Sequence, residues 1–312
     1  MRRKNNLEIP HSKPVSGRTL TSEVIHRFRK NRLGMIALFV LVLLVAVAIG
    51  TTVCDFVTKD AYYNELVVGQ DLMLKLQEPN FNSLGDIFGR DEYGRSVFFR
   101  IVWGTRYSIF MGVTVILMAT LIGGCIGSIA GYYGGKVDNF IMRCMDVLLA
   151  IPYILFAIAI VASLGTSTAN LMIAMTIPKI PHMARVVRAS VMTVKDREFI
   201  EAGRVMGASD FKIISKYILP NAASPIIVQA TLGIAQCILG IAGLSYLGLG
   251  VQSPTPEWGS MLVSAKIYLR DAWHITVIPG LVIIIAVMAF NIFGDALRDA
   301  LDPKQKGGRG KK

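Results

Sequence analysis

The side chains that could do chemistry in this chain of 312 residues are few and widely separated. Neither the histidines nor the cysteines have the spacing of an HExxH or CxxC motif, so we predict no metal site and interpret the cysteines as small buried apolar residues. No Gly-Lys-Ser or Gly-Lys-Thr occurs, so the chain lacks the phosphate-binding loop of an ATPase, and we expect it to bind no cofactor itself. The residues concerned are His11, His26, His182, His274, Cys54, Cys125, Cys144 and Cys237.

A serine nucleophile is the best remaining candidate for catalysis. The fragment Gly243-Leu244-Ser245-Tyr246 lacks the second glycine of a GxSxG turn, and no histidine lies near it in sequence. Small residues in an apolar segment explain the fragment as helix packing. We therefore predict no catalytic residues, and an intramembrane hydrolase remains the alternative from another class of protein.

Ion-coupled transport is also poorly supported by the charged residues. The long uncharged stretches contain no Asp or Glu that could carry a coupling ion at membrane depth, and the nearest, Asp146 and Asp295, flank them. Lys179, between Pro178 and Pro181, is a cation near one such stretch. We interpret it as extending toward the cytoplasmic interface, with a role in transport as the alternative.

The stretch Glu198–Asn221, EFIEAGRVMGASDFKIISKYILPN, is charged and contains glycine breaks in a chain that is 53% hydrophobic. Its periodicity predicts a helix from Asp196 to Met206, with one apolar side. Gly207 can end that helix in the left-handed conformation, and Ser209 or Asp210 can begin a second helix. We expect that second helix to run from Phe211 to Ile218 and to end at Pro220. The resulting hairpin either folds against the base of the protein or presents an apolar surface to a partner.

Long apolar stretches predict the elements that carry this hairpin. Five stretches without Asp, Glu, Lys or Arg are each long enough to cross a membrane, and a turn-like cluster at residues 164–170 divides the third into two. The sequence therefore predicts an all-α polytopic membrane protein with six transmembrane helices. The stretches are Leu33–Cys54, Tyr107–Gly135, Val147–Pro178, Tyr217–Pro256 and Ala272–Gly294, and the added fourth span covers about Leu171–Val187.

Charge asymmetry supports an even number of spans. Residues 1–32 hold nine basic and two acidic side chains, and residues 295–312 hold six basic and three acidic ones, so both tails are predicted in the cytoplasm. Residues 55–104 hold five basic and eight acidic side chains, which is typical of an external loop. The net charge of +12 follows from this topology, and we predict no nucleic-acid partner.

These patterns divide the chain into successive regions. We expect a cytoplasmic tail (1–32), a first span (33–54), and an external loop (55–106) with a helix in the membrane interface. In that helix, Val97, Ile101 and their neighbours form the apolar side, while Arg95 and Arg100 point elsewhere. A five-helix core (107–294) follows, with the hairpin at 188–220, and then a second cytoplasmic tail (295–312).

Glycine recurs at every fourth position in the second predicted span, at Gly123, Gly127, Gly131 and Gly135. Such a row removes side chains from one helical face and allows close backbone approach. The packing partner is another helix of this chain or a second subunit, and the pattern does not choose between them.

The motif Glu201-Ala202-Gly203, then Gly207, then Ile218-Leu219-Pro220 resembles the EAA signature of membrane subunits of ATP-binding-cassette (ABC) importers. Further segments are similar to the dipeptide, oligopeptide and nickel permease family, in particular to its C-type subunit. These segments are Gly89–Arg95, Trp103–Arg106, Gly131–Gly135, Asp146–Pro152, Gly207–Asp210, Leu244–Gly250, Trp258-Gly259 and Asp299–Pro303. The sequence departs from the family at Gly203, where a second alanine is usual, and at Tyr217, Arg90 and Ser96.

The resemblance implies a type I ABC importer permease fold and a role in ATP-driven peptide import across the cytoplasmic membrane. It implies a second homologous permease subunit, two ABC ATPases that bind ATP and Mg, and an extracytoplasmic peptide-binding protein, with membrane lipid around the bundle. Nickel or a nickel chelate is the alternative cargo within the family. The ATPase-docking residues implied by the motif are Phe199, Glu201, Ala202, Gly203, Met206, Gly207, Ala208, Ser209, Asp210, Leu219 and Pro220.

Overall fold

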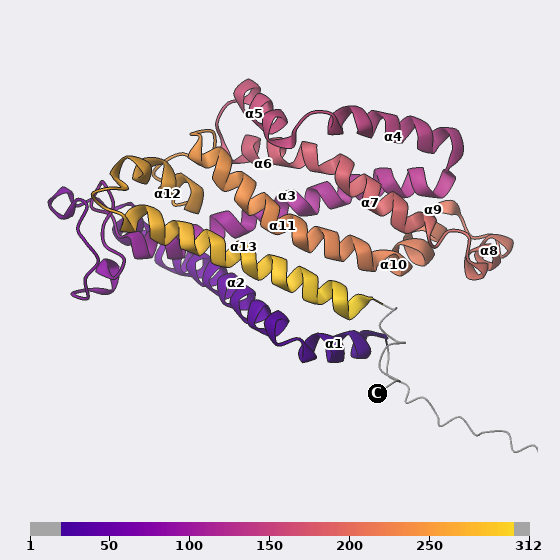
Figure 1. Cartoon of the computed structure of the whole chain (residues 1–312), viewed down its shortest axis with the longest axis horizontal. Helices are drawn as coiled ribbons and strands as arrows, with labels where there is room; N and C mark the ends of the chain where they lie inside the picture. Colours follow the sequence, from indigo (N-terminus) through magenta and orange to yellow (C-terminus); the bar gives the residue numbers. More distant parts are fainter. Residues whose placement is uncertain (1–19, 303–312) are drawn as a thin grey trace, which may run out of the picture.

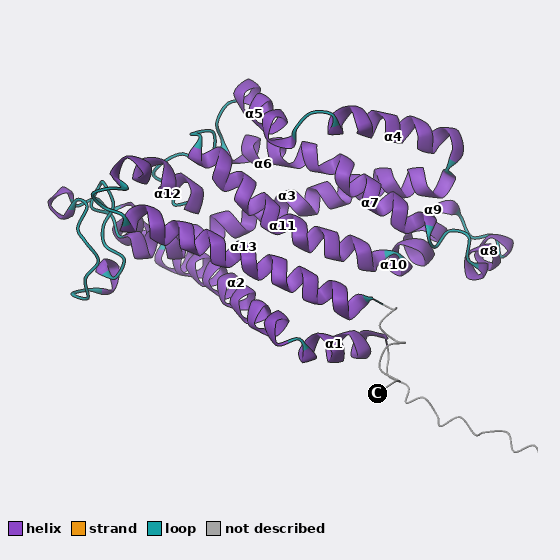
Figure 2. Cartoon of the chain, viewed as in Figure 1, coloured by secondary structure: helices purple, strands orange, loops and turns teal. Residues whose placement is uncertain are grey.

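The computed structural model describes residues 20–302, and within this range it consists of helices and loops without a strand (Figures 1 and 2). The long helices run side by side and form one elongated bundle. This confirms the predicted all-α fold. The elements, in order, are α1 (Leu20–Lys30), α2 (Arg32–Thr58), η1 (Tyr63–Val68), η2 (Leu72–Leu74), η3 (Leu84–Asp86), α3 (Val97–Tyr133), α4 (Gly135–Leu149), α5 (Tyr153–Leu164), α6 (Thr168–Thr176), η4 (Ile177–Lys179), α7 (Ile180–Met192), α8 (Glu198–Val205), α9 (Asp210–Lys212), η5 (Ile213–Ile218), α10 (Leu219–Asn221), α11 (Ala223–Tyr246), α12 (Trp258–Ala265), η6 (Lys266–Tyr268) and α13 (His274–Leu301).

Four uninterrupted helices in the described range are long and apolar enough to cross a membrane, namely α2, α3, α11 and α13. The predicted third span, which begins at Val147, contains only the end of α4 and the short helix α5. These two helices are bent by 80° relative to each other, so the pair is a fifth span only if it is taken as one broken element. The predicted fourth span consists of α6, η4 and α7, which follow one another without a loop. Helix length alone therefore supports four or five spans, and the predicted fourth span, which would make six, is an interrupted helix.

The glycine row packs within the chain. A Cβ added at Gly123 would lie 2.8 Å from the Ile180 carbonyl oxygen, and one at Gly131 would lie 2.9 Å from the Arg188 carbonyl oxygen. A Cβ added at Gly127 would lie closer still to the backbone of α7, at the Ala184 carbonyl oxygen. Helices α3 and α7 therefore approach at backbone distance. Gly135 is an exception to the predicted row, because it has φ +54° at the start of α4 and no neighbour within 4 Å of an added Cβ.

The bundle has two distinct ends. Helix α8 lies at one end, together with α1 and the last turn of α13, and α12 lies at the other with the loops after α2 (Figure 1). We call these the hairpin end and the loop end. The predicted tails (1–32 and 295–312) are partly helical, as α1 and the end of α13, and residues 1–19 and 303–312 lie outside the described range.

The predicted interfacial helix is not a separate element, because residues from Val97 onward form the first turns of α3. Both sides of this part of α3 are buried, including Arg100 and Ile101, and so is the preceding Arg95. Trp103 is also buried, and its indole Nε1 donates to Asp55 Oδ1 over 2.9 Å. The loops at this end cover the helix, so the prediction of a helix exposed to lipid headgroups is wrong.

Candidate functional site

The stretch Glu198–Asn221 forms a compact hairpin at the hairpin end (Figure 1), as the sequence predicts. Gly207 ends the first arm with φ +77°, the left-handed conformation expected for a glycine after a helix. Ser209 Oγ accepts the amide of Lys212 over 3.4 Å and so caps the start of α9. The second arm runs without a break through α9, η5 and α10 and ends at Asn221, one residue after Pro220, close to the predicted end, before α11 begins at Ala223.

The hairpin contains its own hydrophobic core. Ile200 from the first arm and Ile213 and Ile218 from the second are fully buried. They pack with Val191 at the end of α7 and with Val194 in the turn after it. Burying an isoleucine contributes about 2 kcal/mol, so this cluster fixes the angle of the hairpin on the bundle. The hairpin is thus folded against the base of the protein.

A second set of apolar side chains on the hairpin is exposed. Val205 is 89% exposed, Met206 76%, Phe211 81% and Phe199 40%. Val205 and Met206 end the first arm, and Phe211 begins the second, so three of the four lie around the Gly207 turn. The hairpin therefore has features of both predicted alternatives. One face packs against the base of the protein, and the turn exposes apolar side chains.

The predicted docking residues divide between these two faces. Glu201, Ala202, Met206, Gly207, Ser209, Asp210 and Pro220 are exposed with Phe199, and Ala208 and Leu219 are half-buried. Gly203 is buried, and a Cβ built on it would lie 3.8 Å from the Tyr217 ring, so it faces the second arm and not a partner. Val205 and Phe211 are exposed but are not among the predicted docking residues. Phe211 comes two residues after the Ser209 cap and so lies in the first turn of the second arm, and this position was the one indication in the sequence that it is exposed.

Polar contacts join the hairpin to α3. The hydroxyl groups of Tyr132 and Tyr133 donate to the two carboxylate oxygens of Asp210 over 2.7 and 3.0 Å. The Arg204 guanidinium lies 5.4 Å from the centre of the Tyr132 ring, within the range of a cation–π contact. The hydrogen bonds from Tyr132 and Tyr133 lower the pKa of the Asp210 carboxyl below its usual range, and Arg204 adds to this effect. The carboxylate thus stays ionised and holds both arms near α3.

Ion pairs extend the connection to α4. Arg188, near the end of α7, forms two hydrogen bonds to the carboxylate of Asp138 in α4, and Arg185 pairs with Asp146 over 2.8 Å. Because α7 leads directly into the hairpin, these pairs and the α3–α7 glycine contacts make the support of the hairpin rigid. The arrangement is suited to transmit a displacement of the hairpin to the membrane helices.

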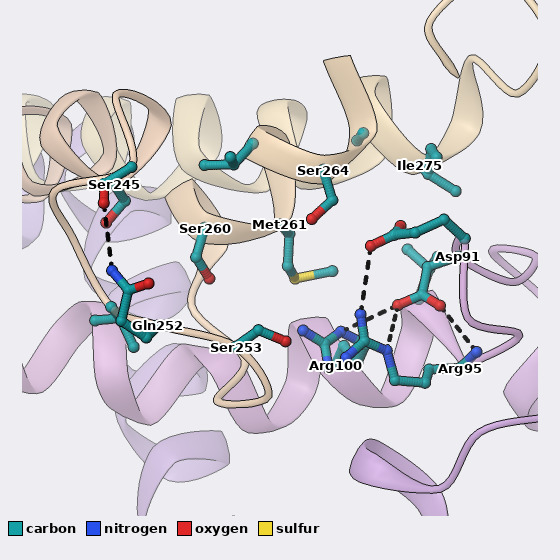
Figure 3. A pocket seen from close by; sticks show the side chains of 16 residues that line it. Asp91, Arg95, Arg100, Ser245, Gln252, Ser253, Ser260, Met261, Ser264 and Ile275 are labelled. Carbon is teal, nitrogen blue, oxygen red and sulfur yellow. Dashed lines mark hydrogen bonds and ion pairs between the residues drawn. The ribbon is translucent and has the colours of Figure 1, made fainter. Parts of the chain in front are cut away.

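A polar cavity lies at the opposite, loop end (Figure 3). Its volume is about 150 Å³, and the segment before α3, the loop after α11 and helix α12 line it. Asp91 pairs with Arg95 over 2.7 Å, and Arg100 lies 3.5 Å from the same carboxylate. Arg100 also donates to the carbonyl oxygens of Val67 and Pro254, so it connects two loops that are distant in sequence.

Ser245 and the Trp258-Gly259 segment also lie at the loop end, and their contacts there are structural. Ser245 is buried, and its hydroxyl has no hydrogen-bond partner in the described part of the chain, so no histidine activates it as a nucleophile. Gly259 lets α12 meet the backbone of α11 at Ala242. The buried Glu257 accepts the amides of Gly259 and Ser260 over 2.9 and 2.8 Å and caps α12.

Comparison with known proteins identifies the family. Residues 123–307 match the model for "binding-protein-dependent transport system inner membrane component", and residues 19–79 match "N-terminal TM domain of oligopeptide transport permease C". The chain is 41% identical to the dipeptide transport system permease protein DppC of Alkalihalophilus pseudofirmus, over 91% of this chain and 90% of that protein. It is 42% identical to the glutathione transport system permease protein GsiD of Escherichia coli, over 96% and 95% of the two chains.

Solved structures show the same fold. The inward-facing MetNI methionine ABC transporter matches with a TM-score of 0.53 and 19% identity, over 66% of this chain and 98% of the matched chain. The predicted type I importer permease fold is thereby confirmed. The chain therefore belongs to the family of inner-membrane permease components of binding-protein-dependent ABC importers, with the N-terminal domain of the oligopeptide permease C branch.

Proposed function

We propose that this protein is a permease subunit that imports peptides across the cytoplasmic membrane with energy supplied by separate ATPases. The single observation that carries this proposal is the rigidly supported hairpin with an exposed apolar turn, in a chain that is related over nine-tenths of its length to a dipeptide permease. The chain is a multi-pass membrane protein and a non-catalytic component of its transporter. Relatives named for dipeptide and glutathione transport favour a peptide cargo over nickel.

The partners follow from the family and from the shape of the chain. A binding protein delivers the cargo, and ATPases that bind ATP and Mg supply the work. We further propose two ATPases and a second, homologous permease subunit, the partners that the resemblance to the peptide permease family implies. Neither ATP nor Mg contacts this chain in the proposed mechanism.

The coupling step uses the exposed turn of the hairpin. Val205, Met206 and Phe211 insert into an apolar groove of an ATPase, and ATP-driven closure of the two ATPases displaces the turn. The buried isoleucines and the Tyr132–Asp210 contact pass this displacement to α3 and α7. The close α3–α7 contact makes the two helices move together, so that the cargo site opens to one side of the membrane at a time.

This mechanism requires the hairpin end in the cytoplasm, with both termini on the same side. The positions of α1 and the end of α13 at the hairpin end support that orientation, since the basic tails adjoin them. Labelling with a membrane-impermeant maleimide tests it in a variant whose native cysteines are replaced by alanine. A cysteine at Phe211 should react in inside-out vesicles, and one at Phe81, at the loop end, should react in right-side-out vesicles.

Affinity purification of the intact complex tests the function as a whole. We expect the chain to co-purify with ATPases and a homologous permease, and reconstituted vesicles to take up a tripeptide only when ATP and the binding protein are present. Uptake without ATP, or a complex without any ATPase, would contradict the proposal.

A further inference from the structure

Lys179 lies at the middle of the bundle, in the 3₁₀ turn η4 between α6 and α7. With a rise of 1.5 Å per residue, it is roughly 16 Å from Thr168 and roughly 20 Å from Met192, the two ends of this helical run. Its partner Gln236 in α11 is likewise roughly 20 Å from Ala223, at the hairpin end, and roughly 15 Å from Tyr246. If the ends of these helices mark the limits of the membrane, both helices place the ammonium group near its mid-depth, farther from either end than a four-carbon stem reaches.

The contacts of Lys179 are all to neutral groups. Its Nζ donates to Gln236 Oε1 over 3.1 Å and lies 4.8 Å from the centre of the Tyr153 ring. In the range 20–302, no carboxylate forms an ion pair with it, although the side chain is half-buried. The Gln236 amide and the Tyr153 ring hold the ammonium at the middle of these two helices, which favours a role in transport over an extension toward the cytoplasmic interface.

The neighbouring cations of the same helical run do have carboxylate partners. Arg188 pairs with Asp138, and Arg185 pairs with Asp146, both from α4. Helix α4 ends at Leu149, and the chain then turns by 80° into α5. The acidic helix therefore stops before it reaches Lys179, and the bend brings Tyr153 to the lysine in place of an acid.

A cation without an ion pair at mid-depth is costly, and such residues face the interior of an assembly or a water-filled path. The Gln236 amide and the Tyr153 ring orient the ammonium but leave its charge to be neutralised by another group. We propose that Lys179 binds a carboxylate of the cargo, such as the C-terminal carboxylate of a peptide, as the cargo crosses the membrane. This site rests on the proposed function, since it assumes a cargo that carries a carboxylate.

Trialanine, carried by the intact transporter in membrane vesicles, is a probe for this site. We expect Lys179→Gln to lower its uptake at least about tenfold, the effect of losing a hydrogen bond between charged groups. Lys179→Arg keeps the charge and should retain more than about a third of the wild-type uptake. Lys266→Gln is the matched control, because Lys266 also lies over a tyrosine ring, 5.1 Å from Tyr246, but at the loop end of α11. It should take up trialanine at the wild-type rate, and all variants should assemble with their ATPases.

Carbodiimide cross-linking during transport identifies the group that Lys179 meets, because the reagent joins an amine only to a carboxylate in contact with it. Mass spectrometry should find isotope-labelled trialanine attached to Lys179. An adduct with an aspartate or glutamate of another subunit, or wild-type uptake by Lys179→Gln, would overturn the site. If trialanine uptake is normal but no adduct forms, the carboxylate site at Lys179 is contradicted, while the proposed peptide transport is not. Wild-type vesicles that take up no trialanine contradict the proposed peptide cargo and the site that rests on it.

Discussion

The Tyr132 hydroxyl donates a 2.7 Å hydrogen bond to the Asp210 carboxylate and so joins the last turn of α3 to the first residue of α9. The two residues are far apart in sequence, and Tyr133 donates to the other oxygen of the same carboxylate over 3.0 Å. Together with the buried isoleucines, this contact makes the hairpin an extension of α3 and α7 rather than a loop between two spans.

Asp210→Asn should loosen the hairpin, because the neutral amide accepts the tyrosine hydroxyl groups more weakly than a carboxylate does. The pKa of Asp210 is lowered in the folded protein, so its contribution is present above the ordinary carboxyl pKa of about 3.9 and is lost as the pH falls through the lower folded value. The mobility of a spin label at Val205 should be constant from pH 8 to about pH 5 and should rise below about pH 4. The same acid-induced rise in Asp210→Asn would show that another group is responsible.

Gly207→Val should separate ATP hydrolysis from uptake. An added Cβ would have no neighbour within 4 Å, so its cost arises from the left-handed backbone at φ +77°, about 1–2 kcal/mol or more for a β-branched residue. Asparagine tolerates this conformation, so Gly207→Asn is the control and should keep most of the wild-type coupling. The measurement is the ratio of peptide taken up to ATP hydrolysed. Equal ratios in the valine and asparagine variants would show that the left-handed backbone at residue 207 is not the cause of any loss of coupling.

Gly203→Ala should stabilise the hairpin and leave transport intact. The new methyl group would meet the Tyr217 ring at 3.8 Å, an ordinary contact, and alanine favours α8 over glycine by about 1 kcal/mol. Hydrogen exchange of the α8 amides should slow accordingly. A loss of ATPase association in this variant would indicate instead that residue 203 contacts the ATPase.

Gly127→Ala should weaken the α3–α7 contact by about 1–3 kcal/mol, because the methyl group would overlap the Ala184 carbonyl group. Gly124→Ala is the matched control in the same helix, since its Cβ would have no neighbour within 4 Å. Thermal unfolding of the purified complex should begin at a lower temperature only for Gly127→Ala. Equal stability of the two variants would contradict backbone packing at this position.

Local chemistry allowed part of this architecture to be predicted from the sequence. Gly207 and Ser209 determine the hairpin turn through a left-handed residue and a side-chain cap, and both act within a few residues. The row at Gly123, Gly127 and Gly131 predicted close packing, although its partner, α7, became clear only from the fold.

Other features depend on contacts between distant segments and could not be predicted in this way. Arg100 can be buried because the carbonyl groups of Val67 and Pro254 accept its hydrogen bonds. Both residues are distant in sequence, so the periodicity around Arg100 could not predict these contacts. Gly203 belongs to a motif that suggested docking, yet its side of α8 is covered by Tyr217. The hydrogen-bond partner of Lys179, Gln236, likewise lies in another helix, and the sequence around Lys179 does not predict it.

Photo-cross-linking from the hairpin turn is the most direct test of coupling through this segment. A photoreactive residue at Met206, which is exposed at the turn, should capture an ATPase in the assembled transporter, and one at Phe81, exposed at the loop end, should not. Capture of the ATPase from position 81, or only of the binding protein from position 206, would contradict the account.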